Sequence, residues 1–123
     1  MTDYSNCTLC PFECHANRSS GQLGRCAMTN QMRVARIAPH YWEEPPLSGQ
    51  GLEEPIMGSG TVFFVGCSLG CVFCQNSKIS SKASALGSVY SEYDLATELL
   101  KLQDRGVHNI NFVTASHFAP SVI

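Results

Sequence analysis

The sequence predicts an α/β fold that begins with a βαβ unit and is preceded by a small cysteine-rich module. Two observations predict the unit: strand, helix and strand patterns follow one another within residues 61–114, and the middle pattern has helical periodicity. The cysteine-rich module is predicted because four of the seven cysteines lie in the first 26 residues. We therefore divide the chain into a cysteine-rich module (1–30), a strand with a Pro/Gly-rich loop (31–60) and an α/β part (61–123).

The elements follow from local patterns. Residues 31–38 alternate apolar and polar side chains and predict a short strand. Residues 44–60 are rich in proline and glycine and predict a loop. The β-branched and aromatic run 61–65 predicts a buried strand. The polar stretch 77–88 is predicted to cover the preceding cysteine loop or to be mobile.

A helix is predicted to begin after Ser91, whose hydroxyl caps the free amides, with Asp94 completing an imperfect capping box. Gly106 is predicted to end it. Leucines share its apolar face, namely Leu95, Leu99 and Leu102. A second strand is predicted at 109–114, parallel to the first. Residues 117–123 are predicted to begin another helix.

Two parallel strands and one helix leave the faces of a parallel sheet uncovered, although such sheets are normally buried on both sides. We therefore expect a truncated chain. The alternative is completion by a partner, or by self-association through the open edge of the second strand.

Three cysteines with the spacing Cys67-x-x-x-Cys71-x-x-Cys74 follow the strand predicted at 61–65. Gly66 separates that strand from Cys67. Three thiolates on one short loop suit a [4Fe–4S] cluster, and no fourth cysteine follows at short range. One iron is then open to a ligand that is not protein. Structural zinc prefers four protein ligands, and a disulfide framework needs an oxidising compartment. The pattern therefore favours an open iron–sulfur cluster.

The other four cysteines, Cys7, Cys10, Cys14 and Cys26, lie in a short segment that contains several glycines. Four such thiolates hold either a tetrahedral zinc ion or a second iron–sulfur cluster, and the pattern leaves this choice open. A catalytic dithiol of Cys7 and Cys10 is a third alternative, but it lacks the strand and helix of thioredoxin-like motifs. His15 is either a substitute ligand or, as we expect, a surface residue.

Composition and charge exclude several classes of protein. The 123 residues carry a net charge of −2 without a basic stripe, which argues against nucleic-acid partners. The amino terminus lacks the features of a signal peptide, and no apolar run is long enough to cross a bilayer. The sequence therefore predicts a cytoplasmic, reducing location without a membrane partner.

The cysteine loop resembles that of the radical S-adenosylmethionine (SAM) enzymes, and its Cys74-Gln75-Asn76 end resembles one subgroup of them. Other segments are similar to the pyruvate formate-lyase activating enzyme homologues within that superfamily: residues 7–26, 40–49 and 60–64. The resemblance covers nearly the whole chain. It implies a partial (β/α)6 barrel, of which residues 61–123 hold the first strands and helix.

The resemblance also implies the chemistry. The cysteines of the loop would bind a [4Fe–4S] cluster, at which SAM is reductively cleaved to a 5′-deoxyadenosyl radical, and Phe73 would lie beside the adenine. Many members hold the SAM amino group with a Gly-Gly-Glu segment after the second strand. Here the segment reads Thr114-Ala115-Ser116-His117, so backbone carbonyls or the Ser116 hydroxyl would take that role.

An electron donor of the flavodoxin or ferredoxin type is implied as a partner, together with either a protein or a small-molecule substrate. The alternative function is an iron–sulfur or zinc-binding module without radical catalysis. Two smaller choices stay open. His117 either acts at the end of a barrel strand or packs there. The polar and aromatic segment 40–44 either lines a substrate cleft or consists of packed aromatic side chains and a solvated turn.

Overall fold

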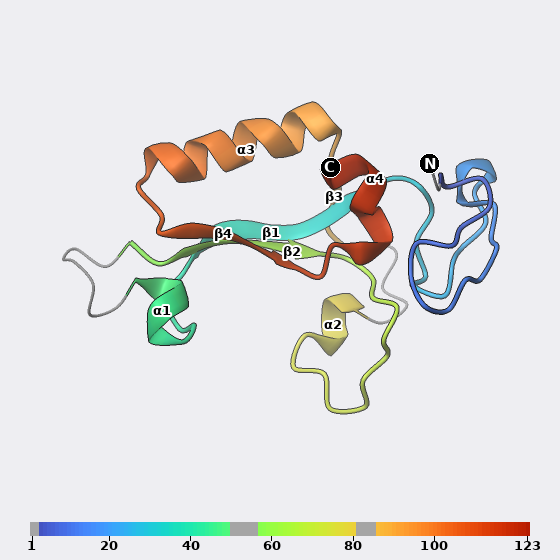
Figure 1. The fold of residues 1–123 in the computed structure, drawn as a ribbon, viewed down its shortest axis with the longest axis horizontal. Helices are drawn as coiled ribbons and strands as arrows, with labels where there is room; N and C mark the ends of the chain where they lie inside the picture. The colour runs from blue at the N-terminus through green and yellow to red at the C-terminus, as the bar shows by residue number, and fades with distance from the viewer. Residues whose placement is uncertain (1–2, 50–56, 81–85) are drawn as a thin grey trace.

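The computed structural model describes residues 3–49, 57–80 and 86–123 and contains a mixed four-stranded sheet (Figure 1). The order of its strands is β3-β1-β2-β4. The strands are β1 (Arg33–His40), β2 (Ser59–Phe64), β3 (Ser88–Val89) and β4 (Asn109–Val113). β1 pairs antiparallel with both β2 and β3, whereas β2 and β4 are parallel. The parallel pair confirms the predicted strand–helix–strand unit. The antiparallel partners of β1 were not predicted.

β2 is one of the two interior strands of the sheet, because it pairs with β1 on one side and with β4 on the other. Its Val62 and Phe64 side chains are buried, and Thr61 is buried as well. β-branched and aromatic residues suit a strand that is covered by neighbours, which explains why this element was predictable. The partial (β/α)6 barrel stays a prediction, since the described sheet holds one parallel pair of strands.

The prediction of a loop over 44–60 was wrong, whereas the prediction for 77–88, that it covers the cysteine loop or is mobile, is not contradicted. The predicted loop at 44–60 contains the short helix α1 (Pro45–Ser48), and its last residues already belong to β2. Two prolines at the first helical positions are tolerated because their missing N–H groups would be unpaired there. The polar stretch at 77–88 contains the short helix α2 (Ser77–Ser80) and the start of β3. The rest of both predictions falls on residues 50–56 and 81–85, outside the described residues.

Helix α3 (Glu92–Asp104) connects β2 to β4 and begins as predicted. The Ser91 hydroxyl accepts the Asp94 N–H at 3.1 Å, and the Asp94 carboxylate accepts the Ser91 N–H at 3.0 Å. The capping box is therefore complete, although aspartate is shorter than the usual glutamate. Gly106 follows the helix with a φ of 78°, a left-handed conformation that glycine adopts without strain.

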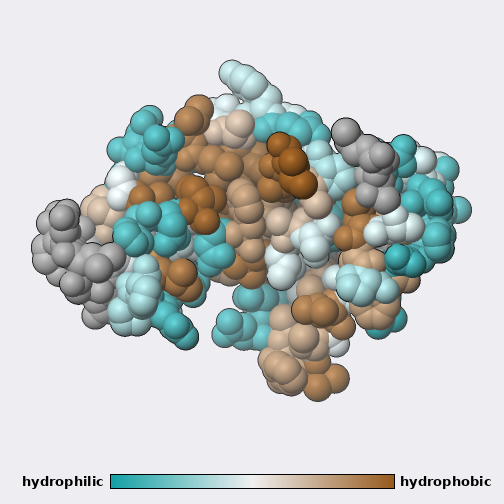
Figure 2. Space-filling model, viewed as in Figure 1, coloured by the Kyte–Doolittle hydropathy of each residue, from teal (hydrophilic) through white to brown (hydrophobic). Residues whose placement is uncertain are grey.

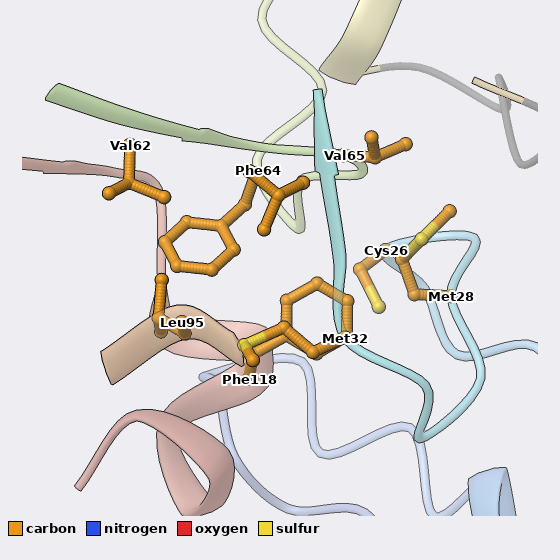
Figure 3. Packing of buried hydrophobic residues seen from close by; sticks show 9 residues of the cluster. Cys26, Met28, Met32, Val62, Phe64, Val65, Leu95 and Phe118 are labelled. Atoms are coloured by element: carbon orange, nitrogen blue, oxygen red, sulfur yellow. The ribbon is translucent and has the colours of Figure 1, made fainter. Parts of the chain in front are cut away.

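α3 packs on one face of the sheet and closes the hydrophobic core (Figure 1). In Figure 3 the Phe64 ring lies among Val62, Leu95 and Phe118. Phe118 comes from the 3-10 turn η2 (Ser116–Phe118), which continues into α4 (Ala119–Val122). The predicted second helix thus begins with a 3-10 turn. No helix within the described ranges is long and apolar enough to cross a membrane.

The amino-terminal loops, which include the 3-10 turn η1 (Arg18–Ser20), lie beside α4 (Figure 1). The Tyr4 hydroxyl forms a hydrogen bond with the Ser121 hydroxyl at 3.0 Å. The first and last segments of the chain are therefore in direct contact, and the cysteine-rich module packs against the end of the βαβ unit.

We expect Leu102→Ala to lower the free energy of unfolding by about 2–5 kcal/mol, because this side chain is 3% exposed and its loss leaves a cavity. Leu100→Ala on the same helix is the control. Its side chain is 61% exposed, so the loss should stay below about 0.5 kcal/mol. Urea denaturation followed by circular dichroism measures both. Equal losses would contradict the packing of α3.

Candidate metal centres

The loop with the three spaced cysteines joins the carboxyl end of β2 to α2. The Gly66 N–H donates to the Ile79 carbonyl at 2.8 Å and closes the base of the loop. A turn inside it is closed by the Cys74 N–H and the Cys71 carbonyl at 3.3 Å. Gly66 and Gly70 have φ values of 82° and 68°, a left-handed backbone that favours glycine. The two glycines thus let the chain double back within a few residues.

All three cysteine side chains of this loop are reachable from solvent. Cys67 and Cys74 are half-buried, and Cys71 is exposed. The Leu69 N–H donates to the Cys67 sulfur at 3.5 Å, and the Cys74 sulfur lies 3.3 Å from the Ser80 hydroxyl. Across the parts of the chain that the structure describes, no three His, Cys, Asp or Glu side chains have the spacing of metal ligands. The cluster therefore stays a prediction.

The tip of the same loop presents large apolar side chains to solvent. Leu69 is 65% exposed, Phe73 is 86% exposed and Val72 is fully exposed. Figure 2 shows this apolar surface projecting below the rest of the molecule. Phe73, predicted to lie beside an adenine, is thus on an exposed surface next to Cys74.

A polar cavity of about 500 Å³ lies beside the cysteine loop. Residues of β1, β2 and β4, of the segment after β1 and of the segment after Cys74 line it: His40, Trp42, Glu43, Phe63, Gln75, Asn76, Asn111 and Val113. The His40 Nδ1 atom lies 3.1 Å from the Glu43 carboxylate, without the alignment of a hydrogen bond. Trp42 is 89% exposed, so the interpretation of this aromatic as packing was wrong. The cleft interpretation of segment 40–44 agrees with the cavity.

Three of the four amino-terminal cysteines converge. Cys7 and Cys26 are buried and Cys14 is exposed, and a Cβ atom on Gly24 would lie 3.3 Å from the Cys26 sulfur and 3.6 Å from the Cys14 sulfur. The pKa of Cys14 is lowered, mainly because the backbone N–H groups of Ala16 and Arg25 donate to its sulfur. Burial raises the pKa of Cys26. The sulfurs of this set therefore have unlike environments.

Cys10 and the possible substitute ligand His15 lie on the same segment as Cys7 and Cys14. Cys10 is half-buried on the same loop, where the Glu13 N–H donates to the Cys10 carbonyl at 3.0 Å. His15 is exposed, and its Nδ1 atom is 3.0 Å from the Asn6 side-chain oxygen. His15 is thus a surface residue, as expected.

The two cysteine sets lie next to each other. A Cβ atom on Gly66 would be 2.5 Å from the Met28 Cγ atom and 2.7 Å from the Cys26 carbonyl oxygen. The segment after Cys26 therefore packs directly against the residue before Cys67. A cavity of about 230 Å³ has both of these cysteines in its lining. The sequence did not indicate this proximity, because the sets are 41 residues apart.

Arg18 joins the cysteine module to the sheet and was not singled out from the sequence. Its side chain is fully buried, and its Nη1 group donates to the His117 carbonyl at 2.7 Å. Nη2 donates to the Thr29 carbonyl at 2.7 Å, and Nε donates to the Met28 carbonyl at 3.1 Å. Nη1 also lies 3.6 Å from the Cys7 sulfur. One arginine in a polar segment carries no sequence signal for such a role.

His117 is buried, in agreement with the packing interpretation. Its Nε2 atom is 2.9 Å from the Val65 carbonyl oxygen, which only accepts, so Nε2 carries the proton. Nδ1 is buried without a partner. Burial lowers the pKa of His117 to about 4, and the nearby Arg18 charge acts in the same direction. Ser116, a predicted SAM contact, is exposed just beyond β4.

The comparisons with known proteins leave the family open. No family model matches the chain, and no solved structure matches it. The chain is 36% identical over 77 residues to the uncharacterized protein MJ0674 of Methanocaldococcus jannaschii. The matched segment is 63% of this chain and 20% of that protein. The chain thus spans about a fifth of the length of this relative.

We expect Gly66→Ala to lower the free energy of unfolding by at least about 2 kcal/mol. The new Cβ atom would clash with the Met28 side chain and the Cys26 carbonyl oxygen. The matched control is Gly70→Ala in the same loop. Gly70 also has a positive φ, but nothing lies within 4 Å of its added Cβ, so only backbone strain of about 1 kcal/mol is expected. Chemical denaturation measures both, and a larger loss for Gly70→Ala would contradict the packing.

The stability of the protein should fall in acid because of His117. Its pKa is about 4 in the folded state and near 6.5 when unfolded, so the unfolded chain binds more protons between these values. This histidine should therefore remove on the order of 3 kcal/mol of stability as the pH falls from neutral to about 4. His117→Gln lacks this group, and its unfolding free energy should fall less steeply. Parallel curves for the two proteins would contradict the burial of a neutral imidazole.

Proposed function

We propose that this chain carries the cluster-binding part of a radical SAM enzyme. One observation carries the proposal: three cysteines with the spacing found in that superfamily occupy a single loop at the carboxyl end of the interior strand β2. In parallel α/β folds, chemistry is commonly placed at this end of the strands. The proposal rests on the sequence resemblance together with this placement.

Cys67, Cys71 and Cys74 would hold a [4Fe–4S] cluster, each through its thiolate. These three cysteines suit a [4Fe–4S] cluster, because thiolates are the usual ligands of iron–sulfur clusters. Cys71 is exposed, so the loop is open to solvent on its side. When bound, a cluster with one open iron supplies the electron that cleaves SAM to methionine and a 5′-deoxyadenosyl radical. The Leu69 N–H already donates to the sulfur of Cys67, one of these ligands.

The polar cavity beside the loop supports the proposal that the protein binds SAM. Gln75 and Asn76 reach it directly after the last cysteine, and Asn111 contributes from β4. These amides offer donors and acceptors to the ribose and to the amino acid part of SAM. The exposed Ser116 hydroxyl beyond β4 would bind the amino group, and Phe73 would lie beside the adenine.

The exposed position of the loop also suits electron delivery. Apolar side chains surround the thiols at its tip, and an electron donor of the flavodoxin or ferredoxin type would dock there. Specificity for a protein or small-molecule substrate would depend on parts of a barrel that lie beyond β4.

Electron paramagnetic resonance tests the proposal on protein reconstituted anaerobically with iron and sulfide. We expect the reduced protein to show a [4Fe–4S] signal that changes when SAM is added, because SAM would bind an open iron. Cys71→Ala should abolish the SAM-dependent change, since one ligand of the cluster is lost. Cys14→Ser is the matched control and should leave that change intact. A response to SAM that survives in Cys71→Ala would contradict the ligand assignment.

The alternative is an iron–sulfur or zinc-binding module without radical catalysis. If the paramagnetic resonance signal of the reconstituted cluster does not change when SAM is added, an electron-transfer module is favoured. Protein that takes up no iron would favour zinc.

A further inference from the structure

Two amino-terminal cysteines share an unusual local backbone. Cys14 and Cys26 each accept an N–H from the residue two positions later, Ala16 and Met28. Each cysteine is followed by a residue with a positive φ: 53° at His15 and 63° at Ala27. Non-glycine residues rarely adopt this conformation, and it costs about 1–3 kcal/mol. The repeated arrangement aims one backbone donor at each of the two sulfurs.

The sulfurs of this set surround a single glycine. A Cβ atom on Gly24 would lie 3.3 Å from the Cys26 sulfur and 3.6 Å from the Cys14 sulfur. The Arg18 side chain, whose Cδ atom would be 3.3 Å from the same Cβ, reaches the Cys7 sulfur with its Nη1 group at 3.6 Å. Glu13, whose N–H closes the turn at Cys10, also has a positive φ, of 39°. Within the described ranges, the non-glycine residues with positive φ are thus Glu13, His15 and Ala27, all next to these cysteines.

Arg18 supplies a second, independent observation. Its guanidinium is fully buried and always charged, yet no carboxylate among the described residues pairs with it. Its acceptors are backbone carbonyls and the Cys7 sulfur, and the rings of Tyr4 and Phe118 lie 4.7 Å and 5.6 Å from it. A buried charge without an opposite charge is costly. The negative charge that this site lacks would come from neighbouring thiolates.

We propose that Cys7, Cys10, Cys14 and Cys26 bind one zinc ion as thiolates, and that the buried guanidinium of Arg18 balances part of the charge of this site. Binding replaces four thiol protons, which pass to solvent, and the resulting centre has a net charge of −2. The cation of Arg18 lies against one of its ligands. This inference goes beyond the proposed function and does not depend on it.

A single ion fits these thiols better than a second iron–sulfur cluster. Tetrahedral Zn–S bonds of about 2.3 Å hold the four sulfurs close together, and the Cys14 and Cys26 sulfurs already flank a single glycine. A [4Fe–4S] cluster places each thiolate on a separate iron, which spreads the sulfurs apart. Among the described residues no three of these side chains have the spacing of metal ligands, so binding would require the four cysteine side chains to move together. His15 does not compete, since its ring contacts Asn6.

Zinc content tests the proposal on the full chain. We expect about one zinc ion per chain by mass spectrometry of the metal. Cys14→Ser should lose it, because one of four ligands is removed at an exposed position. Cys71→Ser is the matched control and should retain it. Zinc that persists in Cys14→Ser, or iron and sulfide bound at these cysteines, would overturn the proposal.

Cobalt(II) serves as an optical probe of the same site. Titration of the metal-free protein should produce thiolate-to-cobalt absorption in the wild type and in Cys71→Ser, and not in Cys14→Ser. No such absorption in the wild type would overturn the proposal as well. Because neither zinc nor cobalt binding involves SAM, these results are separate from the paramagnetic resonance test of the proposed function.

Two variants test the role of Arg18 as a positioning charge. Arg18→Met should weaken cobalt affinity by about 10- to 100-fold, the usual effect of losing a group that supports metal ligands. Arg18→Lys keeps the charge and should recover part of that loss. If neither variant folds without metal, zinc should restore the folded circular dichroism spectrum of Arg18→Lys at lower concentration than that of Arg18→Met. Equal affinities of both variants would overturn the role of the charge.

Discussion

The buried guanidinium of Arg18 is the interaction on which the arrangement of this chain depends. It connects segments far apart in the sequence, because it donates to the Met28 and Thr29 carbonyls within the cysteine module and to the His117 carbonyl beyond β4. A fixed charge in a dry interior tolerates little displacement of its acceptors. The module is therefore held against the end of the βαβ unit in one orientation, with Tyr4 and Phe118 covering the charge.

That orientation brings the two cysteine sets together. The segment after Cys26 packs on Gly66, where even a methyl group would not fit, and the His117 ring binds the Val65 carbonyl just before it. Both contacts act on the base of the loop that begins at Cys67. A change in the amino-terminal module, such as the binding of a metal ion, would reach this loop through close packing, since packed interiors transmit small displacements.

The faces of the sheet have different chemical characters. On one face Val62 and Phe64 pack with α3 in a core that excludes water. A polar cavity beside the cysteine loop is lined by Phe63 of β2 and by Asn111 and Val113 of β4, among others. Alternation of side chains along a strand places consecutive residues on opposite faces, so one short strand serves both the core and the cavity. This arrangement positions polar groups next to the thiols while the core below them stays rigid.

Much of the local structure could be predicted because its causes are local. The run at 61–65 has the β-branched and aromatic side chains of a buried strand, and the helix start at Ser91 depends on a cap four residues long. The short helices α1 and α2 and the antiparallel pairing of β1 were missed. Each of these depends on distant neighbours or on a few residues of weak preference.

The sequence by itself determined the donor chemistry: which thiols are present, how they are spaced, and which of them share a loop. The tertiary structure decided what surrounds them. The burial of Arg18, the contact of Cys26 with the base of the Cys67 loop and the cavity next to Gln75 and Asn76 all join residues that are distant in the chain. Spacing along a chain encodes local geometry, whereas desolvation and charge pairing depend on which segments pack together, and that is set only by the whole fold.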